Sequence, residues 1–266
     1  MNKNNDAFWN VEQTIYKTSE GDIEIPHFYY DFSQVLFFYF VKPEKLLPLL
    51  EGTDLKPCVC VNNRAIVNLI LLEYRDSSIG SYNEIGLSSL TYSTKLKKPF
   101  FVFPNFFKKG DKWKIAGYIH NLPVTSKAAY AAGVEIFGYP KFITEIPFAL
   151  TEKSFEAAVC DPDSDSNIFS ISCPIGYKSF GLKMSGVDLV TYSNNKGVQL
   201  KSYISVDAKT QNNFFPSVKL KVGESNHVMA QNLRHLGLEN KSPFSVSTTQ
   251  TARGVGPHSA VVSGEY

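Results

Sequence analysis

The chain has 266 residues and a formal net charge of +2, with 43% hydrophobic and 20% charged residues. This is the composition of a folded globular protein, and the near-neutral charge gives no indication of nucleic acid or an acidic membrane as a partner. The length suits one domain with a single core, and we expect residues 1–266 to form it.

The four cysteines and the N-terminal residues indicate a reducing compartment. Four cysteines without a Cys-x-x-Cys motif do not make a disulfide framework. Residues 1–15 are mostly polar and contain no signal-peptide core, and no window approaches the roughly 20 apolar residues of a membrane span. We therefore expect a soluble, cytoplasmic protein with no membrane partner.

Strand patterns dominate the first part of the chain. The runs VLFFYFV (35–41) and AIVNLILLEY (65–74) are almost continuously apolar, which is typical of strands buried on both faces. Between them, KPEKLLPLLE (42–51) predicts a helix that Pro48 keeps short.

A second helix is predicted by the alanine-rich segment SKAAYAAG (126–133). Ser126 is a candidate N-cap because its side chain can accept a hydrogen bond from the first helical turn. Gly133 is a candidate stop.

The C-terminal part again reads mainly as strands. SNNKG (193–197) predicts a hairpin turn, VKLKV (218–222) a strand, and NHVMAQNLRHLG (226–237) a third helix. In VQLKSYISV (198–206) the alternation predicts one face formed by Val198, Leu200, Ile204 and Val206, and another formed by Gln199, Lys201 and Tyr203.

Strands thus outnumber helices by several to one. We predict a mainly β (α+β) fold, an antiparallel β sheet closed or nearly closed into a barrel or cone with two or three short helices.

Several common functional motifs are absent from the sequence. It contains no Gly-x-Gly-x-x-Gly after a strand, no phosphate-binding loop, no His-Glu-x-x-His and no Gly-x-Ser-x-Gly. The five histidines are scattered, so the sequence predicts no metal site.

One lysine stands in an apolar segment, EIFGYPKFITEIPF (135–148), directly after a proline. The wider stretch AYAAGVEIFGYPK (129–141) resembles the signature of the acetoacetate decarboxylase family, in which Gly-x-Glu leads through Tyr-Pro into a lysine that forms a Schiff base with a ketone. The matching positions are Gly133, Glu135, Tyr139, Pro140 and Lys141.

A second segment supports the same resemblance. GSYNE (80–84) is similar to the family's Gly-x-Tyr-x-Glu stretch, whose glutamate faces the active site; this implies that Glu84 lies in the site. Without the resemblance, Glu84 would be an ordinary exposed loop carboxylate and Lys141 a surface lysine. Glu135 is expected to have a structural role near the alanine-rich helix.

The resemblance implies a cone-like antiparallel barrel, a homo-oligomer, and no metal or organic cofactor. It implies that Lys141 is the Schiff-base lysine and that Glu84 serves the proton transfers. Tyr139 lies two residues before Lys141 and would wall the substrate pocket if the backbone is extended there. A lysine amine with its ordinary pKa near 10.4 is protonated at neutral pH, and apolar surroundings such as those in this segment favour the neutral, nucleophilic form.

The sequence departs from the family at two positions. Phe142 replaces a second lysine, and because neighbouring residues of a strand point to opposite faces, Lys141 is expected to remain competent. Phe32, with Asp31 beside it, stands where the family has an arginine, and His27 or a distant arginine or lysine is a candidate to replace that cation.

These features predict a carbon–carbon lyase that decarboxylates a small β-keto acid, acetoacetate or a relative, through Lys141. The missing arginine leaves open a Schiff-base aldolase or dehydratase acting on another keto acid. A non-catalytic barrel that binds an apolar ligand, with Lys141 only a contact, is the remaining alternative.

Overall fold

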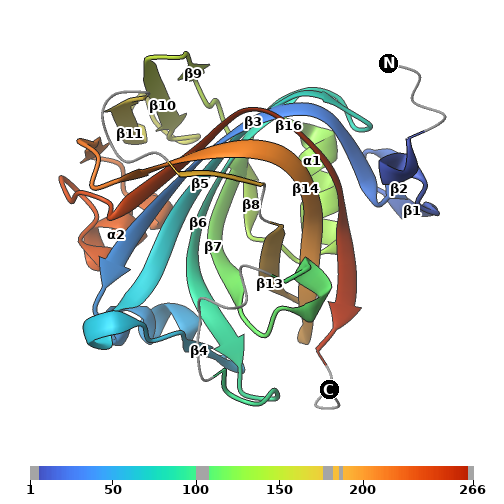
Figure 1. The fold of residues 1–266 in the computed structure, drawn as a ribbon, viewed down its shortest axis with the longest axis horizontal. Helices are drawn as coiled ribbons and strands as arrows, with labels where there is room; N and C mark the ends of the chain where they lie inside the picture. Colours follow the sequence, from blue (N-terminus) through green and yellow to red (C-terminus); the bar gives the residue numbers. More distant parts are fainter. Residues whose placement is uncertain (1–5, 100–107, 176–181, 186–187, 263–266) are drawn as a thin grey trace.

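The computed structural model describes residues 6–99, 108–175, 182–185 and 188–262, and its centre is a closed β barrel (Figure 1). Around the barrel, β6 is followed by β5, β3, β16, β14, β13 and β7, and β7 pairs with β6 again. The strands are β3 (His27–Val41), β5 (Ala65–Ser77), β6 (Tyr82–Ser93), β7 (Ala116–Val124), β13 (Leu189–Asn195), β14 (Val198–Phe214) and β16 (Ser245–Val261). The predicted mainly β, barrel-forming fold is confirmed.

Most barrel strands pair antiparallel, with two exceptions. Strand β7 runs parallel both to β13 and to the short strand β8 (Lys141–Ile143). Two further strands extend the sheet: β4 (Leu55–Pro57) on β6 and β12 (Leu182–Ser185) on β14.

A second sheet covers part of the outer wall. It consists of β9 (Phe148–Leu150), β10 (Ser154–Cys160), β11 (Asn167–Pro174) and β15 (Lys219–Val222). Phe37 of β3 meets Phe155 of β10 with ring centroids 5.8 Å apart, whereas its neighbours Leu36 and Phe38 line a cavity inside the barrel. The predicted burial of 35–41 on both faces is therefore confirmed. A separate hairpin pairs β1 (Thr14–Thr18) with β2 (Gly21–Ile25).

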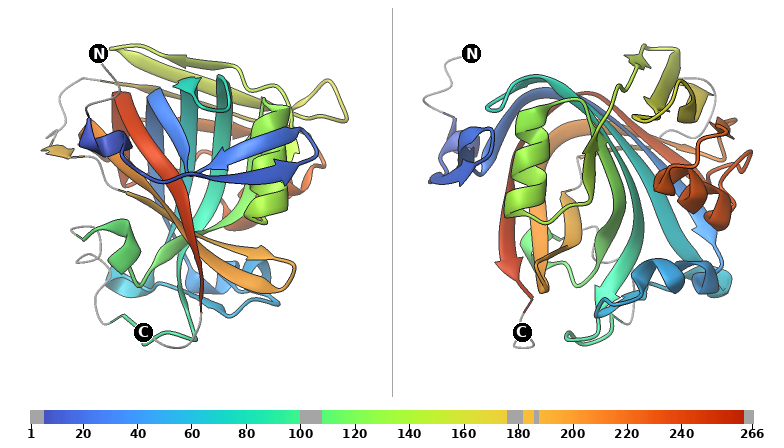
Figure 2. Two further views of the ribbon diagram at one scale, coloured as in Figure 1. Left: turned by 90° about the vertical axis from the view of Figure 1, so that its right-hand side faces the viewer. Right: turned by 180° about the vertical axis from the view of Figure 1, so that it is seen from behind.

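The helices are short, as predicted. Helix α1 (Lys127–Ala131) continues as the π-helical segment η8 (Ala132–Ile136), and seen from behind the pair stands in front of the barrel strands (Figure 2). Ser126 is the N-cap, as predicted, since its hydroxyl accepts a hydrogen bond from the Ala129 amide. The predicted stop at Gly133 is wrong: the helix continues past this glycine.

Helix α2 (Val228–Leu236) confirms the third predicted helix, with His227 as its N-cap and Gly237 at φ +67° after its last turn. The predicted helix over 42–51 is instead two 3₁₀ turns, because Pro48 interrupts it. The 3₁₀ turns of the chain are η2 (Ala7–Trp9), η3 (Pro43–Leu46), η4 (Pro48–Leu50), η5 (Val61–Asn63) and η7 (Gly110–Lys112). Within the described residues, no helix has the length and apolar character to cross a membrane.

The predicted hairpin at 193–197 is confirmed by the pairing of β13 with β14, but the start of β14 differs from the predicted faces. Val198 is 44% exposed, while Gln199 is buried and accepts a hydrogen bond from Ser93. The alternation is correct farther along, where Val206 is buried.

Candidate active site

Lys141 and Glu84 meet inside the barrel. The Lys141 ammonium donates to Glu84 Oε2 at 2.5 Å, and the two side chains are only 7% and 12% exposed. Glu84 projects from β6 and Lys141 opens β8, so the pair joins segments on either side of β7. Ion pairs with so little access to water are rare, because each charge loses its hydration.

The position of the lysine depends on Gly133. A Cβ atom at Gly133 would lie 2.2 Å from Lys141 Cε and 2.4 Å from Lys141 Cδ, so any side chain at this position would force the lysine stem to move. The Gly133 carbonyl also accepts from the Tyr139 amide, and the Lys141 amide donates to the Tyr139 carbonyl. This tight turn differs from the extended backbone expected at 139–141. The glycine of the motif thus makes room for the lysine stem.

A cluster of aromatic side chains surrounds the Glu84 end of the pair. Tyr74 stacks against Tyr29 and packs against Tyr82, with ring centroids 4.6 and 4.5 Å apart. Burial first, and the Glu84 carboxylate second, raise the pKa values of Tyr29 and Tyr74. Phe32 lies 5.4 Å from Tyr74 by ring centroids and completes the cluster. These tyrosines remain neutral and provide a low-dielectric wall.

His27 is a further titratable group that feels the charge of the lysine. It is 2% exposed, and its Nδ1 finds no hydrogen-bond partner among the described residues. Burial, followed by the positive charge of Lys141, lowers the pKa of His27 to about 4. His27 is therefore a neutral imidazole at pH 7 and does not replace a cationic arginine, although it can donate or accept a hydrogen bond.

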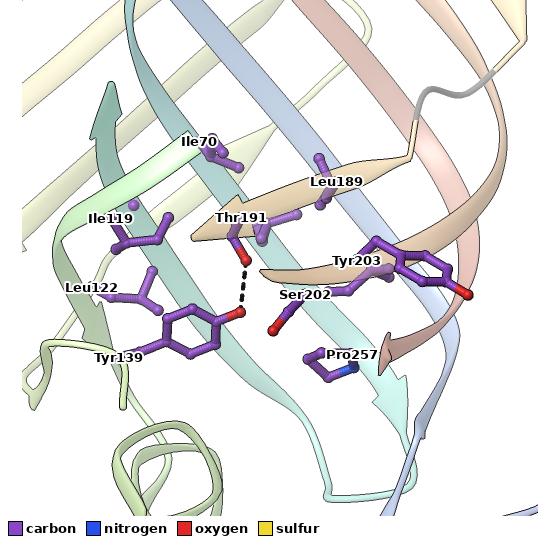
Figure 3. Close-up of a pocket in the computed structure, with 12 residues that line it drawn as sticks. Ile70, Ile119, Leu122, Tyr139, Leu189, Thr191, Ser202, Tyr203 and Pro257 are labelled. Atoms are coloured by element: carbon purple, nitrogen blue, oxygen red, sulfur yellow. Dashed lines mark hydrogen bonds between the residues drawn. The ribbon is translucent and has the colours of Figure 1, made fainter. Parts of the chain in front are cut away.

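Tyr139 is buried and lines a cavity of about 60 Å³. Its hydroxyl lies 2.7 Å from Thr191 Oγ1 of β13, as Figure 3 shows. Leu122 and Leu72 line the same cavity and are the register partners of Lys141 and Glu84, so the cavity lies on the strands next to the pair. Neither Lys141 nor Glu84 is among the described residues that line it.

The positions that depart from the family motif lie mostly outside the site. Phe142 turns away from it, toward His227, with ring centroids 4.3 Å apart. Asp31 also lies outside: Arg75 binds its carboxylate through two nitrogens at 2.7 Å, so the aspartate predicted beside the site does not face it. Of these positions, only Phe32 belongs to the aromatic cluster at Glu84.

Glu135, matched in the same motif, has the structural role that the sequence predicts, but its partner is the turn of the β1–β2 hairpin. Its carboxylate accepts hydrogen bonds from the Ser19 amide and hydroxyl, and so holds the β1–β2 hairpin to η8. Across the described residues, no three His, Cys, Asp or Glu side chains gather where they could hold a metal ion.

The sequence did not predict the tyrosine cluster. Its members come from three strands, and the only available signal was period-two alternation within β5 and β6, where Tyr74 and Tyr82 are register partners. The alternation shows that each faces one side of its strand, but not that both face Glu84.

Several solved structures share the fold of this chain. Solved structures similar to the chain include one from structural studies of acetoacetate decarboxylase (TM-score 0.64, 15% identity, 90% of this chain and 89% of that chain). Another is the acetoacetate decarboxylase of Legionella pneumophila (TM-score 0.61, 14% identity, covering 96% of this chain and 92% of that chain). A third is the enduracididine biosynthesis enzyme MppR with the condensation product of pyruvate and imidazole 4-carboxaldehyde (TM-score 0.56, 11% identity, 90% and 90%).

At these identities the structures establish the fold alone, and a comparison with curated proteins found no match. The family model for acetoacetate decarboxylase (ADC), however, matches residues 14–163, more than half of the chain and both motifs. The chain therefore belongs to the acetoacetate decarboxylase family.

Proposed function

We propose that the protein is a lyase that decarboxylates a β-keto acid, acetoacetate or a relative, through a Schiff base on Lys141. The observation that carries this proposal is the 2.5 Å contact of Lys141 with Glu84 in a nearly dry site. One proton moving along this hydrogen bond converts ammonium and carboxylate into amine and carboxylic acid. The Lys141 amine becomes nucleophilic once its proton has passed to Glu84, and the carboxylate at hydrogen-bond distance provides the acceptor for that transfer.

In the proposed reaction, the Lys141 amine attacks the ketone carbon, and the carbonyl oxygen leaves as water after receiving protons through Glu84. The resulting iminium accepts the electrons of the bond to the carboxylate, and carbon dioxide departs. The enamine takes a proton on carbon to give the ketone iminium, and water then hydrolyses it to release the ketone and free Lys141. The balance is β-keto carboxylate anion plus one proton to ketone plus carbon dioxide.

The aromatic cluster supports loss of the carboxylate. Phe32 provides no cation to stabilise the substrate anion, and a carboxylate that loses its hydration beside aromatic rings gains by becoming neutral carbon dioxide. Tyr139, on the wall of the adjacent cavity, is proposed to contact the substrate.

A second candidate is a Schiff-base aldol-type condensation or dehydration of another keto acid. The product bound to MppR is of this kind, and the same replacement of arginine by Phe32 is compatible with a different substrate. The two candidates share the imine and differ in the bond that is made or broken after it forms.

The proposal is tested by measuring carbon dioxide release from acetoacetate and longer β-keto acids, with Lys141→Met and Glu84→Gln as comparison variants. Release that depends on both residues supports the decarboxylase. An imine on Lys141 without carbon dioxide from any β-keto acid would favour the second candidate, and no imine with any keto acid would leave a non-catalytic barrel.

We also infer a homo-oligomer. Exposed apolar side chains support it, among them Ile15 and Tyr16 of the β1–β2 hairpin, which are 63% and 42% exposed. Light scattering in solution tests this inference.

A further inference from the structure

The inside of the barrel is layered along β5 and β6. Starting at the aromatic cluster, the facing pairs on the inner surface are Tyr74 with Tyr82, Leu72 with Glu84, Ile70 with Gly86, and Asn68 with Ser88. A strand rises about 3.3 Å per residue, so Ser88 lies roughly 13 Å beyond Glu84. The reacting pair therefore occupies one end of a long interior.

The first space beyond the pair is the 60 Å³ cavity of Figure 3, and its lining is mostly aliphatic. Gly86 keeps this space open, because a Cβ there would come within 3.2 Å of Leu122 Cδ1. A hydrocarbon chain attached to a carbonyl at Lys141 would enter here.

A larger cavity of about 330 Å³ lies farther along the barrel. Ile70, Leu189 and Thr191 line both cavities, so the two cavities adjoin at these side chains. The larger cavity has apolar walls that include Leu36 and Phe38, and Trp113 lies on it as well.

One polar side chain of the larger cavity, Gln34, lacks a full set of hydrogen-bond partners among the described residues. Gln34 lines it and is 3% exposed, yet its Oε1 has no hydrogen-bond partner among the described residues. Its Nε2 donates only a long bond, 3.5 Å, to Thr249. A buried acceptor without a partner is unfavourable, so a ligand whose donor reaches Gln34, which is level with Leu72 and Glu84 in the strand register, would satisfy it.

We propose that the substrate is an elongated β-keto acid whose aliphatic chain passes from Lys141 through the small cavity and carries a hydroxyl that donates to Gln34 in the large one. This inference rests on the proposed function for the position of the carbonyl. It names the substrate class: a medium-length, hydroxylated aliphatic keto acid rather than acetoacetate itself.

The first experiment compares imine trapping by borohydride for acetoacetate, 3-oxododecanoate and 11-hydroxy-3-oxododecanoate. Each buried methylene favours binding, so half-maximal trapping should require at least about tenfold less of the twelve-carbon acid than of acetoacetate. The hydroxylated acid should bind about fivefold more tightly still, and Gln34→Leu should abolish that last difference. Equal concentration dependence for all three acids would overturn the inference and leave the proposed function standing.

Variants that fill the large cavity separate chain binding from chemistry. Ser247→Phe, and independently Ser245→Phe, should remove the preference for twelve carbons while acetoacetate is trapped as before, which also shows that the variants fold. Thr251→Phe, at an exposed position of the same strand, is the matched control. It should change neither the preference for twelve carbons nor the trapping of acetoacetate. A long-chain preference that survives both filled variants would contradict the proposed path.

A binding measurement in protein that cannot form an imine tests the cavity separately from the reaction. In Trp9→Phe protein carrying Lys141→Met, Trp113 is the remaining tryptophan, and titration with 2-undecanone should change its emission saturably. The change should disappear in Ser247→Phe. If no keto acid forms an imine but this titration saturates, the proposed function fails while the cavity still binds a chain; if the titration shows no binding, the inference fails.

Discussion

Two ion pairs each join two strands of the barrel sheet, and they differ mainly in their access to water. Lys141–Glu84 has side chains 7% and 12% exposed at 2.5 Å, whereas Arg75–Asp31 has side chains 35% and 43% exposed at 2.7 Å. Similar contact distances thus occur in two very different dielectric surroundings. An exposed pair contributes little and stays charged, while a buried pair is sensitive to every change of charge or position.

The largest effect is expected for Lys141→Met. Borohydride trapping and carbon dioxide release should fall at least about a thousandfold, because the variant has no amine to attack the ketone. The free energy of unfolding, measured by urea titration, should drop by about 3–5 kcal/mol, since Glu84 is left buried without its partner.

Two control variants sharpen this result. The double variant Lys141→Met/Glu84→Gln should recover part of the lost stability and none of the activity, because no uncompensated charge remains. Lys141→Met protein that is as stable as the wild type would show that the pair is more hydrated than its burial indicates.

The next effect concerns pH. The native pKa of His27 is lowered to about 4 by burial and by Lys141, and burial alone lowers that of His120 to about 4. Between pH 6.5 and pH 4 the unfolded chain binds protons at these histidines and the native chain does not. The free energy of unfolding should therefore fall as the pH is lowered through this window, by roughly 3 kcal/mol per histidine. Above about pH 7 neither state is protonated at these histidines, so they should make no pH-dependent contribution there.

His27→Gln should remove about half of this slope in denaturant titrations at pH 7, 5.5 and 4.5. His120, which lies 2.9 Å from Ser89 and not at the lysine, provides the comparison through His120→Gln. A slope unchanged in His27→Gln would mean that His27 titrates normally in the native barrel.

Gly133→Ala should impair the reaction more than the fold. The added methyl group must displace the Lys141 stem, and a shift of about 1 Å in a reacting group can lower the rate about a hundredfold. The trapping rate with acetoacetate measures this effect. Val134→Ala, the neighbouring half-buried position, is the control and should trap at close to the wild-type rate.

The smallest effect is expected at the exposed pair. Arg75→Met and Asp31→Asn should each change the free energy of unfolding by about 1 kcal/mol or less and leave carbon dioxide release unchanged. A large loss of activity in Asp31→Asn would indicate that this carboxylate reaches the substrate, against its position beside Arg75.

Local patterns predicted much of the fold. Continuous apolar runs indicated the doubly buried strands, and the turn at 193–197 indicated the β13–β14 hairpin. The stop at Gly133 was wrong because a glycine within a helical pattern usually ends a helix, whereas here it admits a lysine from another segment. That contact depends on tertiary packing and leaves no local trace.

The candidate site was predictable only through its motifs. Local sequence placed Glu84 in a polar, turn-like stretch, and its burial results from tyrosines on β3 and β5, which are distant in sequence. The opposite orientation of Phe142 was predictable from strand alternation. The depth of the interior could not be read from the sequence, because it depends on which inward positions of seven strands carry small side chains.

The most direct test of the central claim is to incubate the protein with acetoacetate and borohydride and to map the modified peptide. A Schiff-base decarboxylase should carry an isopropyl group on Lys141, the reduced imine of acetone, and Lys141→Met should carry none. A reduced adduct that keeps its carboxylate would place the imine correctly but contradict decarboxylation. Unmodified Lys141 with every keto acid tried would contradict the account as a whole.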